Sequence, residues 1–202
     1  MPKEIRDKSA VLNIQNNDMY CFLWCVKAAL FPTSNRHPER VSSYPDLDNK
    51  FNIKGIKFPM KLHDIPKFEK LNNLRINVYE NSVVVPLHLS NNLSDRKTIH
   101  LLMVESGRYF QTIFHFALIR NLSRLIKSQI SKGHSKLWFC DRCLCHFKYE
   151  RSLKKHLDDC IKFNNVRMRL PEKDEDKILS FKNYKYKDPV PFIIYADFEC
   201  IL

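Results

Sequence analysis

The chain has 202 residues, of which 44% are hydrophobic and 12% aromatic. This is enough for one ordinary domain with a small module, or for two small domains, and it excludes a disordered tail. Its formal net charge of +12 is typical of soluble proteins that bind phosphate polymers or anionic membranes. The longest apolar stretch, residues 20–32, contains Lys27 and is shorter than the roughly 20 residues that span a bilayer, so no membrane segment is expected.

The cysteines and glycines narrow the class of protein further. Seven cysteines, an odd number, in a chain whose amino terminus lacks a signal-peptide pattern argue against a disulfide framework and favour metal or thiol chemistry. None of the three glycines lies in a phosphate-cradling loop, which excludes a nucleotide-binding enzyme of the Walker or dinucleotide type. We expect an intracellular protein, with the nucleus favoured over the cytoplasm.

Residues 9–125 are predicted to form an α+β domain. Its first helix is the apolar stretch MYCFLWCVKAALF, which Asn17 or Asp18 would cap. A second helix is indicated by DIPKFEKLNN, with Asp64 as N-cap and Pro66 in the first turn, where the missing N–H costs nothing. Four strands are expected at residues 74–79, 82–89, 98–104 and 109–119. Helices followed by an antiparallel strand meander give the fold class α+β.

Cys21 and His115 are a candidate thiol site in this domain. Cys21 lies at the start of the first predicted helix, where the helix dipole would lower the pKa of the thiol and favour the nucleophilic thiolate. The pattern D-x-x-C resembles the nucleophile segment of OTU-type cysteine peptidases, and His115 opens the strand HFALI, where OTU-like and papain-like peptidases carry their general base. The alternative is structural, with Cys21 packed in a buried helix and His115 as a satisfied strand histidine.

Residues 126–137 are predicted to be a basic joint that can form a short helix, and residues 138–162 to be a ββα zinc finger. The string CDRCLCHFKYERSLKKHLDDC has the spacing C-x2-C-x12-H-x3-C, which supplies zinc with two donors from a hairpin and two from one helical turn. Phe147 and Leu153 occupy the positions of the small core of such a finger. The predicted zinc ligands are Cys140, Cys143, His156 and Cys160, with Cys145 and His146 as non-ligands.

The helix of this finger is the candidate nucleic-acid contact. In a major-groove geometry the base-reading positions would be Tyr149, Ser152 and Lys155, with Arg151 and Lys154 near phosphates. One finger contacts about three base pairs, too few for useful sequence specificity alone. A purely structural or protein-docking finger is the alternative.

Two segments follow the finger. Residues 163–189 are a charged, proline-containing stretch typical of a linker. Residues 190–202 are predicted to be an apolar strand, in which Asp197 and Glu199 lie two apart and therefore leave the same face. Two-metal nucleases hold divalent ions with such carboxylates, but an edge strand with two solvated acids gives the same pattern.

Three segments together resemble a known family. They are HFALIRNLSRLIKSQISK before the finger, MRLPEKDEDKILSFKNY after it and PVPFIIYADFECI beyond. Their succession around a finger of this spacing resembles the amino-terminal region of the protein-primed family B DNA polymerases of Maverick/Polinton mobile elements. The last segment is similar to the first exonuclease motif of family B polymerases, in which D-x-E supplies ligands for two Mg²⁺ ions.

The resemblance implies DNA as partner, zinc as cofactor and a role in replicating an element's DNA. It also implies that residues 190–202 are the first strand of a truncated RNase H-like exonuclease domain, with Asp197 and Glu199 as vestigial Mg²⁺ ligands. Further exonuclease motifs and the palm aspartates do not follow, so we expect a polymerase fragment that does not polymerise by itself.

Two other functions stay open on the sequence. One is a cysteine peptidase or deubiquitinase with Cys21 as nucleophile and His115 as base, for which ubiquitin or another protein is the candidate partner. The other is a small C2H2-type zinc-finger protein that binds DNA or RNA through its basic charge.

Overall fold

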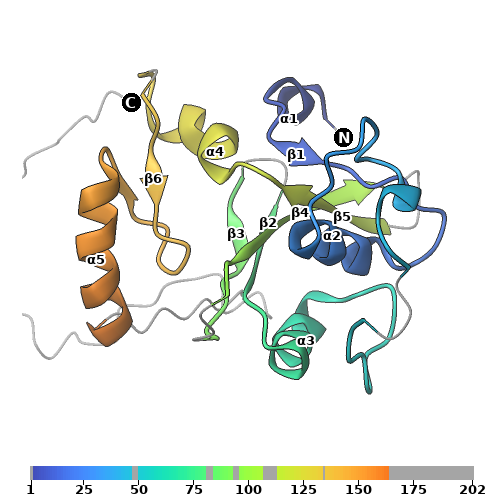
Figure 1. Ribbon diagram of the computed structural model, residues 1–202. Coiled ribbons are helices and arrows are strands. Elements are labelled where there is room, and N and C mark those ends of the chain that lie inside the picture. Colours follow the sequence, from blue (N-terminus) through green and yellow to red (C-terminus); the bar gives the residue numbers. More distant parts are fainter. Residues whose placement is uncertain are drawn as a thin grey trace, which may run out of the picture. The chain divides into compact units, whose positions relative to one another are not determined.

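A mixed β-sheet flanked by helices forms the main body of the protein and confirms the predicted α+β class (Figure 1). The computed structural model describes residues 2–46, 50–80, 84–92, 96–106, 113–133 and 135–163. In the part of the chain that it describes, five strands pair in the order β1-β5-β4-β2-β3. They are β1 (Val11–Leu12), β2 (Ile76–Glu80), β3 (Pro86–His88), β4 (Ile99–Ser106) and β5 (Ile113–Ile119).

The pairing of β2 corrects the predicted antiparallel meander. In a meander β3 would lie between β2 and β4, but β2 pairs directly with β4, and the two strands run parallel from Ile76 opposite Ile99 to Glu80 opposite Met103. Within the described residues, the strand β3 pairs only with the other side of β2. Burial explains this order, because β2 is buried at four successive positions and needs neighbours on both sides, whereas β3 is half-exposed and suits an edge.

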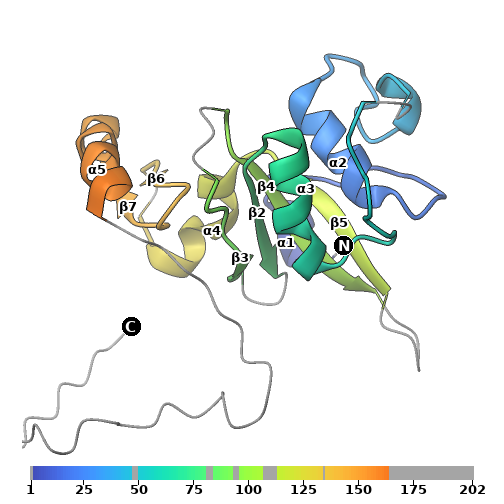
Figure 2. The same ribbon diagram turned by 90° about the horizontal axis from the view of Figure 1, so that it is seen from below.

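Helices cover both faces of the sheet, as Figure 1 and Figure 2 show from two directions. The helices are α1 (Lys3–Asp7), α2 (Cys21–Leu30), α3 (Ile65–Asn72) and α4 (Leu122–Ile130), with short 3-10 turns at Val41–Ser43 and Leu62–Asp64. Side chains alternate along β5, so Phe116 and Leu118 enter the core under α2 and α3, while Ala117 and Ile119 enter the core under α1 and α4.

The helix α2 is apolar enough to be buried almost completely, and it packs on β5. The predicted cap needs a correction, since the N-cap residue is Tyr20 and its side chain makes no capping bond. Asp18 holds the helix start from two residues earlier: its Oδ1 accepts the Tyr20 backbone N–H at 2.8 Å and its Oδ2 accepts the Trp24 indole N–H at 3.0 Å. Asp18 therefore stabilises the first turn, as expected of a capping residue. Its donors are the Tyr20 N–H and the Trp24 indole N–H, not the N–H groups that an N-cap side chain usually accepts.

The helix α3 begins as predicted, with Asp64 as N-cap residue and a proline in the first turn. Its buried Glu69 joins the helix to the sheet. Glu69 Oε1 accepts the Ile76 backbone N–H at 2.7 Å, and Oε2 lies 3.0 Å from His88 Nε2. One carboxylate thus connects α3 with β2 and β3.

A ββα unit follows α4. It consists of β6 (Trp138–Phe139) and β7 (His146–Phe147), which pair antiparallel, and α5 (Glu150–Phe163). Of the segment predicted to be a basic joint, only residues 126–130 belong to helix α4, whose Leu125 and Ile126 are buried in the same core as Phe139 of the ββα unit. This unit is therefore packed on the sheet body through a shared apolar core.

Residues 164–202, which include most of the predicted linker and the whole predicted exonuclease strand, lie outside the described residues. Within the described part, none of the helices has the length and apolar character needed to cross a membrane.

Candidate metal centre

Three cysteines and one histidine converge between the β6–β7 hairpin and α5. The hairpin contributes Cys140 and Cys143, and one turn of α5 contributes His156 and Cys160. Their four ligand atoms all lie within 4.8 Å of one another. Cys143 Sγ is 3.2 Å from His156 Nε2, and Cys140 Sγ is 3.8 Å from Cys160 Sγ. The four residues that the spacing predicted are therefore brought together.

The backbone of the hairpin turn aims the first two cysteines at the helix. The Cys140 N–H donates to the Cys145 carbonyl oxygen at 2.9 Å, and the Leu144 N–H donates to the Cys140 carbonyl oxygen at 2.8 Å. Leu144 closes the turn with a φ of 61°, a left-handed conformation that is uncommon for a leucine. Its side chain packs against the core shared with α4, which compensates for the strained backbone.

Burial makes the cysteine cluster a poor place for free thiolates and a good place for a cation. Cys140 is fully buried and Cys160 is 2% exposed. Burial raises the pKa of the Cys140 thiol, and burial together with the neighbouring Cys140 raises the pKa of Cys160 to about 12. Three sulfurs and one imidazole nitrogen are a donor set that zinc prefers, and a bound cation would stabilise the thiolates. The cluster could therefore hold a metal ion such as zinc.

The remaining side chains of the ββα unit form its small core and its surface. Phe147 packs against the His156 ring with a centroid distance of 4.9 Å, and Leu153 is half-buried. Cys145 and His146 are exposed and are not part of the cluster. Because Phe147 packs on the imidazole, it can orient His156 toward the sulfurs.

Asp141, which lies between the two hairpin cysteines, fastens the metal centre to the sheet. Its carbonyl oxygen accepts a hydrogen bond of 2.6 Å from Asn77 Nδ2, and its carboxylate Oδ1 lies 3.2 Å from His100 Nε2. The other His100 nitrogen, Nδ1, lies 3.2 Å from the Tyr79 hydroxyl. These contacts come from β2 and β4, so the metal-binding turn is held by the centre of the sheet body.

Sequence reasoning missed this attachment, although one signal for it was present. Asn77 interrupts the apolar strand LRINVY, and the structure buries it completely. Its Oδ1 accepts the Ser90 N–H at 2.9 Å while its Nδ2 reaches Asp141. A buried amide in an interior strand needs polar partners, and the sequence could not say which residues they would be.

The predicted nucleic-acid contacts lie on the surface of the ββα unit. Ser152 is half-buried, and the other four are exposed: Tyr149, Arg151, Lys154 and Lys155. The Tyr149 ring is 50% exposed, with the Arg151 guanidinium 5.1 Å and the Lys148 ammonium 5.5 Å from its centre. Lys154 also pairs with Glu150 across one helical turn at 3.3 Å. An exposed aromatic ring is thus flanked by two cations.

The candidate thiol pair gains no support from the geometry. Cys21 is buried in the core under α2, and burial raises the pKa of its thiol, which opposes the expected effect of the helix dipole. Because side chains alternate along β5, His115 is on the same face of the sheet as Ala117. Phe116, which packs in the same core as Cys21, is on the other face. His115 Nε2 lies 2.6 Å from Asn13 Oδ1. Within the described residues Cys21 and His115 therefore belong to opposite faces of the sheet.

Comparison with known proteins finds no family model, no curated protein and no solved structure that matches this chain. The predicted Mg²⁺ ligands Asp197 and Glu199 lie outside the described residues.

Proposed function

We propose that this protein is a zinc-dependent nucleic-acid-binding module, in which the metal holds α5 so that the start of the helix faces a phosphate backbone. The observation that carries the proposal is the exposed Tyr149 ring, which lies between the cations of Arg151 and Lys148. Lys148 and Tyr149 directly precede α5 and Arg151 is in its first turn, and the Cys3His cluster would anchor this helix. Exposed aromatic rings stack on bases, and the adjacent cations pair with phosphates.

The distribution of charge along α5 favours contact at its amino-terminal half. The exposed cations Arg151, Lys154 and Lys155 outnumber the one exposed acid there, Glu150, whereas the exposed acids Asp158 and Asp159 outnumber Lys162 near the other end. Phosphate is attracted to the first half and repelled by the second. The amino-terminal end of a helix dipole adds to this attraction.

The attachment of the finger to the sheet body favours general binding over sequence-specific recognition. Asp141 and Phe139 tie the unit to the sheet body, so the finger is not one of several flexibly linked modules that follow a groove. A single finger reads about three base pairs. Its affinity should therefore come mainly from phosphate contacts and counterion release.

The resemblance to the amino-terminal region of Maverick/Polinton polymerases supplies the biological setting of the proposal. It makes DNA the expected partner and replication of a mobile element's DNA the expected process. In that setting the finger would help a polymerase hold its template, and this chain would bind DNA without polymerising it.

Salt-dependent DNA binding tests the proposal. A duplex of random sequence should bind the zinc-loaded protein with an affinity that falls steeply as salt rises. The double variant Lys154→Ala/Lys155→Ala should reduce the slope of log K against log salt by about 2, since each lost phosphate contact contributes about 0.9. Fluorescence anisotropy titrations between low and moderate salt measure both quantities.

The matched control is Lys61→Ala/Lys70→Ala, which removes the same charge from exposed positions at and before α3. If both double variants change the slope equally, the binding is a property of net charge and the finger has no special role. If the unmodified protein does not bind DNA in low salt, the proposal is wrong. Tyr149→Ala should weaken binding to single strands more than to duplexes, because only unpaired bases are free to stack.

A further inference from the structure

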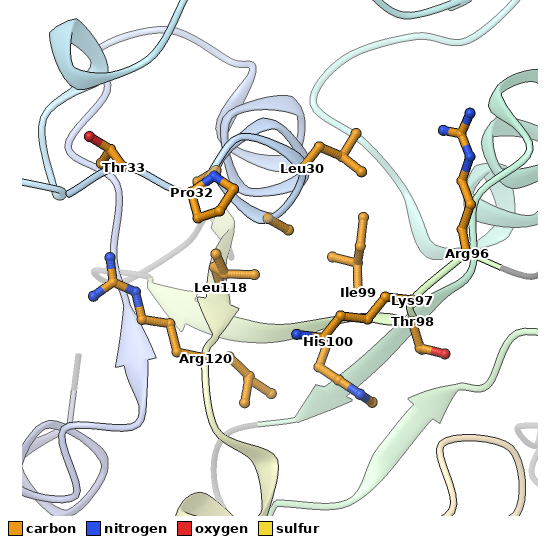
Figure 3. Close-up of a pocket in the computed structure, with 13 residues that line it drawn as sticks. Leu30, Pro32, Thr33, Arg96, Lys97, Thr98, Ile99, His100, Leu118 and Arg120 are labelled. Carbon is orange, nitrogen blue, oxygen red and sulfur yellow. The ribbon is translucent and has the colours of Figure 1, made fainter.

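A pocket of about 640 Å³ lies at one end of the sheet, where α2 ends, β4 begins and β5 ends (Figure 3). This volume falls in the range of about 300–1,000 Å³ that is usual for small-molecule sites. The pocket uses none of the metal ligands and none of the predicted DNA contacts of α5. It therefore has its own set of binding residues, although His100, which contacts Asp141 of the metal centre, also lines it.

The floor of the pocket is aliphatic. It is formed by Leu30 and Pro32 at the end of α2 and by Ile99 of β4 and Leu118 of β5. Ala29 also lines the pocket, and its small side chain leaves the space above the floor open. Such a surface accepts a flat, weakly polar body such as a nucleobase and gains free energy from its burial.

The rim of the pocket is cationic. Arg96, Lys97 and Arg120 line it and are exposed, and the described lining residues include no acid. In Figure 3 the Lys97 side chain extends across the floor toward Leu118, and Arg120 lies on the far side of Leu118. An anionic group above Leu118 could therefore be reached from two sides.

Arg120 is held in place by the structure around it. Its backbone N–H donates to the Ala10 carbonyl oxygen at 2.8 Å at the end of β5. Its guanidinium lies beside the hydroxyl of Tyr44, and that hydroxyl donates to the Pro38 carbonyl oxygen at 2.6 Å. A positioned arginine loses less conformational entropy when it binds an anion than a free one does.

We infer that this pocket binds a nucleoside 5′-monophosphate group, with the base on the Leu30–Leu118 floor and the phosphate between Lys97 and Arg120. A phosphate carries up to two charges and suits a rim with several cations better than a single carboxylate does. The group can be a free nucleotide or the 5′-phosphorylated end of a single strand, since both offer the same chemistry. The inference goes beyond the proposed function of α5 and does not depend on it.

Calorimetric titration of the zinc-loaded full chain separates the two parts of the ligand. Adenosine 5′-monophosphate should bind at least about tenfold more tightly than inorganic phosphate or adenosine, because only it uses both the floor and the rim. Lys97→Ala and Arg120→Ala should each weaken its binding about fivefold or more, as expected for a lost charge-assisted contact. Lys70→Ala, an exposed lysine of α3 outside the pocket, should leave binding unchanged.

Filling the floor tests the apolar half independently. Ala29→Phe should abolish binding of adenosine 5′-monophosphate without changing net charge, and its far-ultraviolet circular dichroism and melting temperature establish that the variant is folded. If that variant does not fold, Leu30→Ala serves instead and should weaken binding of the monophosphate without weakening binding of inorganic phosphate. Equal affinity for phosphate and the monophosphate, or no binding of the monophosphate at about 5 mM, a concentration above the usual range for specific ligands, overturns the inference.

Two further arms identify the source of the ligand and separate the two proposals. In a Tyr149→Ala/Lys154→Ala/Lys155→Ala variant, which lacks the proposed α5 contacts, a 5′-phosphorylated tetrathymidylate that binds more tightly than thymidine 5′-monophosphate assigns the pocket to a strand end, and the reverse order assigns it to a free nucleotide. The Lys154→Ala/Lys155→Ala variant should keep its affinity for the monophosphate. If it loses that affinity, the ligand is binding at α5 and the pocket is not its site.

Discussion

At the scale of single residues, Glu69 determines how α3 meets the sheet. The acid is 3% exposed, and each of its carboxylate oxygens has a partner from a different strand, the Ile76 N–H of β2 and the His88 ring of β3. A buried carboxylate is tolerated only with such partners, because its desolvation is costly. The residue therefore fixes the position of the helix relative to both strands.

Replacing this acid should destabilise the fold strongly. Glu69→Ala would leave a buried N–H and an imidazole unpaired, and we expect it to lower the free energy of unfolding by about 3 kcal/mol. Urea denaturation measures the loss. Glu150→Ala, which removes an exposed acid paired with Lys154, should change stability by less than about 0.5 kcal/mol. Similar losses in the two variants would contradict the structural role of Glu69.

At the scale of elements, α4 shows how a basic segment becomes part of the core. Its buried residues are Leu122, Leu125 and Ile126, a spacing that places them on one face of a helix. Asn121 caps the helix by accepting the Arg124 N–H at 2.9 Å. The cations Arg124 and Lys127 lie on the other faces of the helix. These charged residues, which suggested a solvated joint in the sequence, cover the solvent-facing side of α4.

Truncation within α4 should distinguish its two faces. Leu125→Ala should cost about 3 kcal/mol of unfolding free energy, because Leu125 is fully buried between the sheet and the ββα unit. Ile130→Ala in the same helix should cost less than about 1 kcal/mol, since Ile130 is 41% exposed. Chemical denaturation of both variants tests the assignment, which fails if Ile130 is the more sensitive position.

At the scale of the whole molecule, the metal centre and the sheet body belong to one packed structure. Phe139 shares an apolar core with Leu125 and Tyr79, while Asp141 contacts Asn77 and His100. A metal ion bound at the Cys3His cluster would therefore stabilise the sheet body as well as the ββα unit. Such coupling is expected whenever a metal binds the native state and not the unfolded one.

Removal of the metal should consequently destabilise the sheet body as well as the finger. Loss of the Phe139 burial and the Asp141 contacts amounts to about 3 kcal/mol, which corresponds to a fall of about 6–12 °C in melting temperature for a domain of this size. Near-ultraviolet circular dichroism with and without a zinc chelator measures the change.

The control for metal removal is Asp141→Ala, which loosens the attachment without removing a ligand. In that variant the chelator should lower the melting temperature of the sheet body by a smaller amount. An unchanged melting transition of the unmodified protein after full zinc removal would show that the finger and the sheet body fold independently.

The sequence by itself determined the features that depend on neighbouring residues. The spacing C-x2-C-x12-H-x3-C places Cys140, Cys143, His156 and Cys160 together, because one hairpin and one helical turn bring the donors into reach. In the same way the Asp64 and Pro66 pattern located α3, since both residues act within a single helical turn.

Only the tertiary structure decided the features that depend on residues far apart in the chain. The parallel pairing of β2 with β4, the contact of Asp141 with Asn77 and His100, and the pocket beside Arg120 all join distant segments, for which local propensity carries no information. The same holds for Cys21 and His115: each residue fits a thiol site locally, but strand alternation assigns them to opposite faces of the sheet.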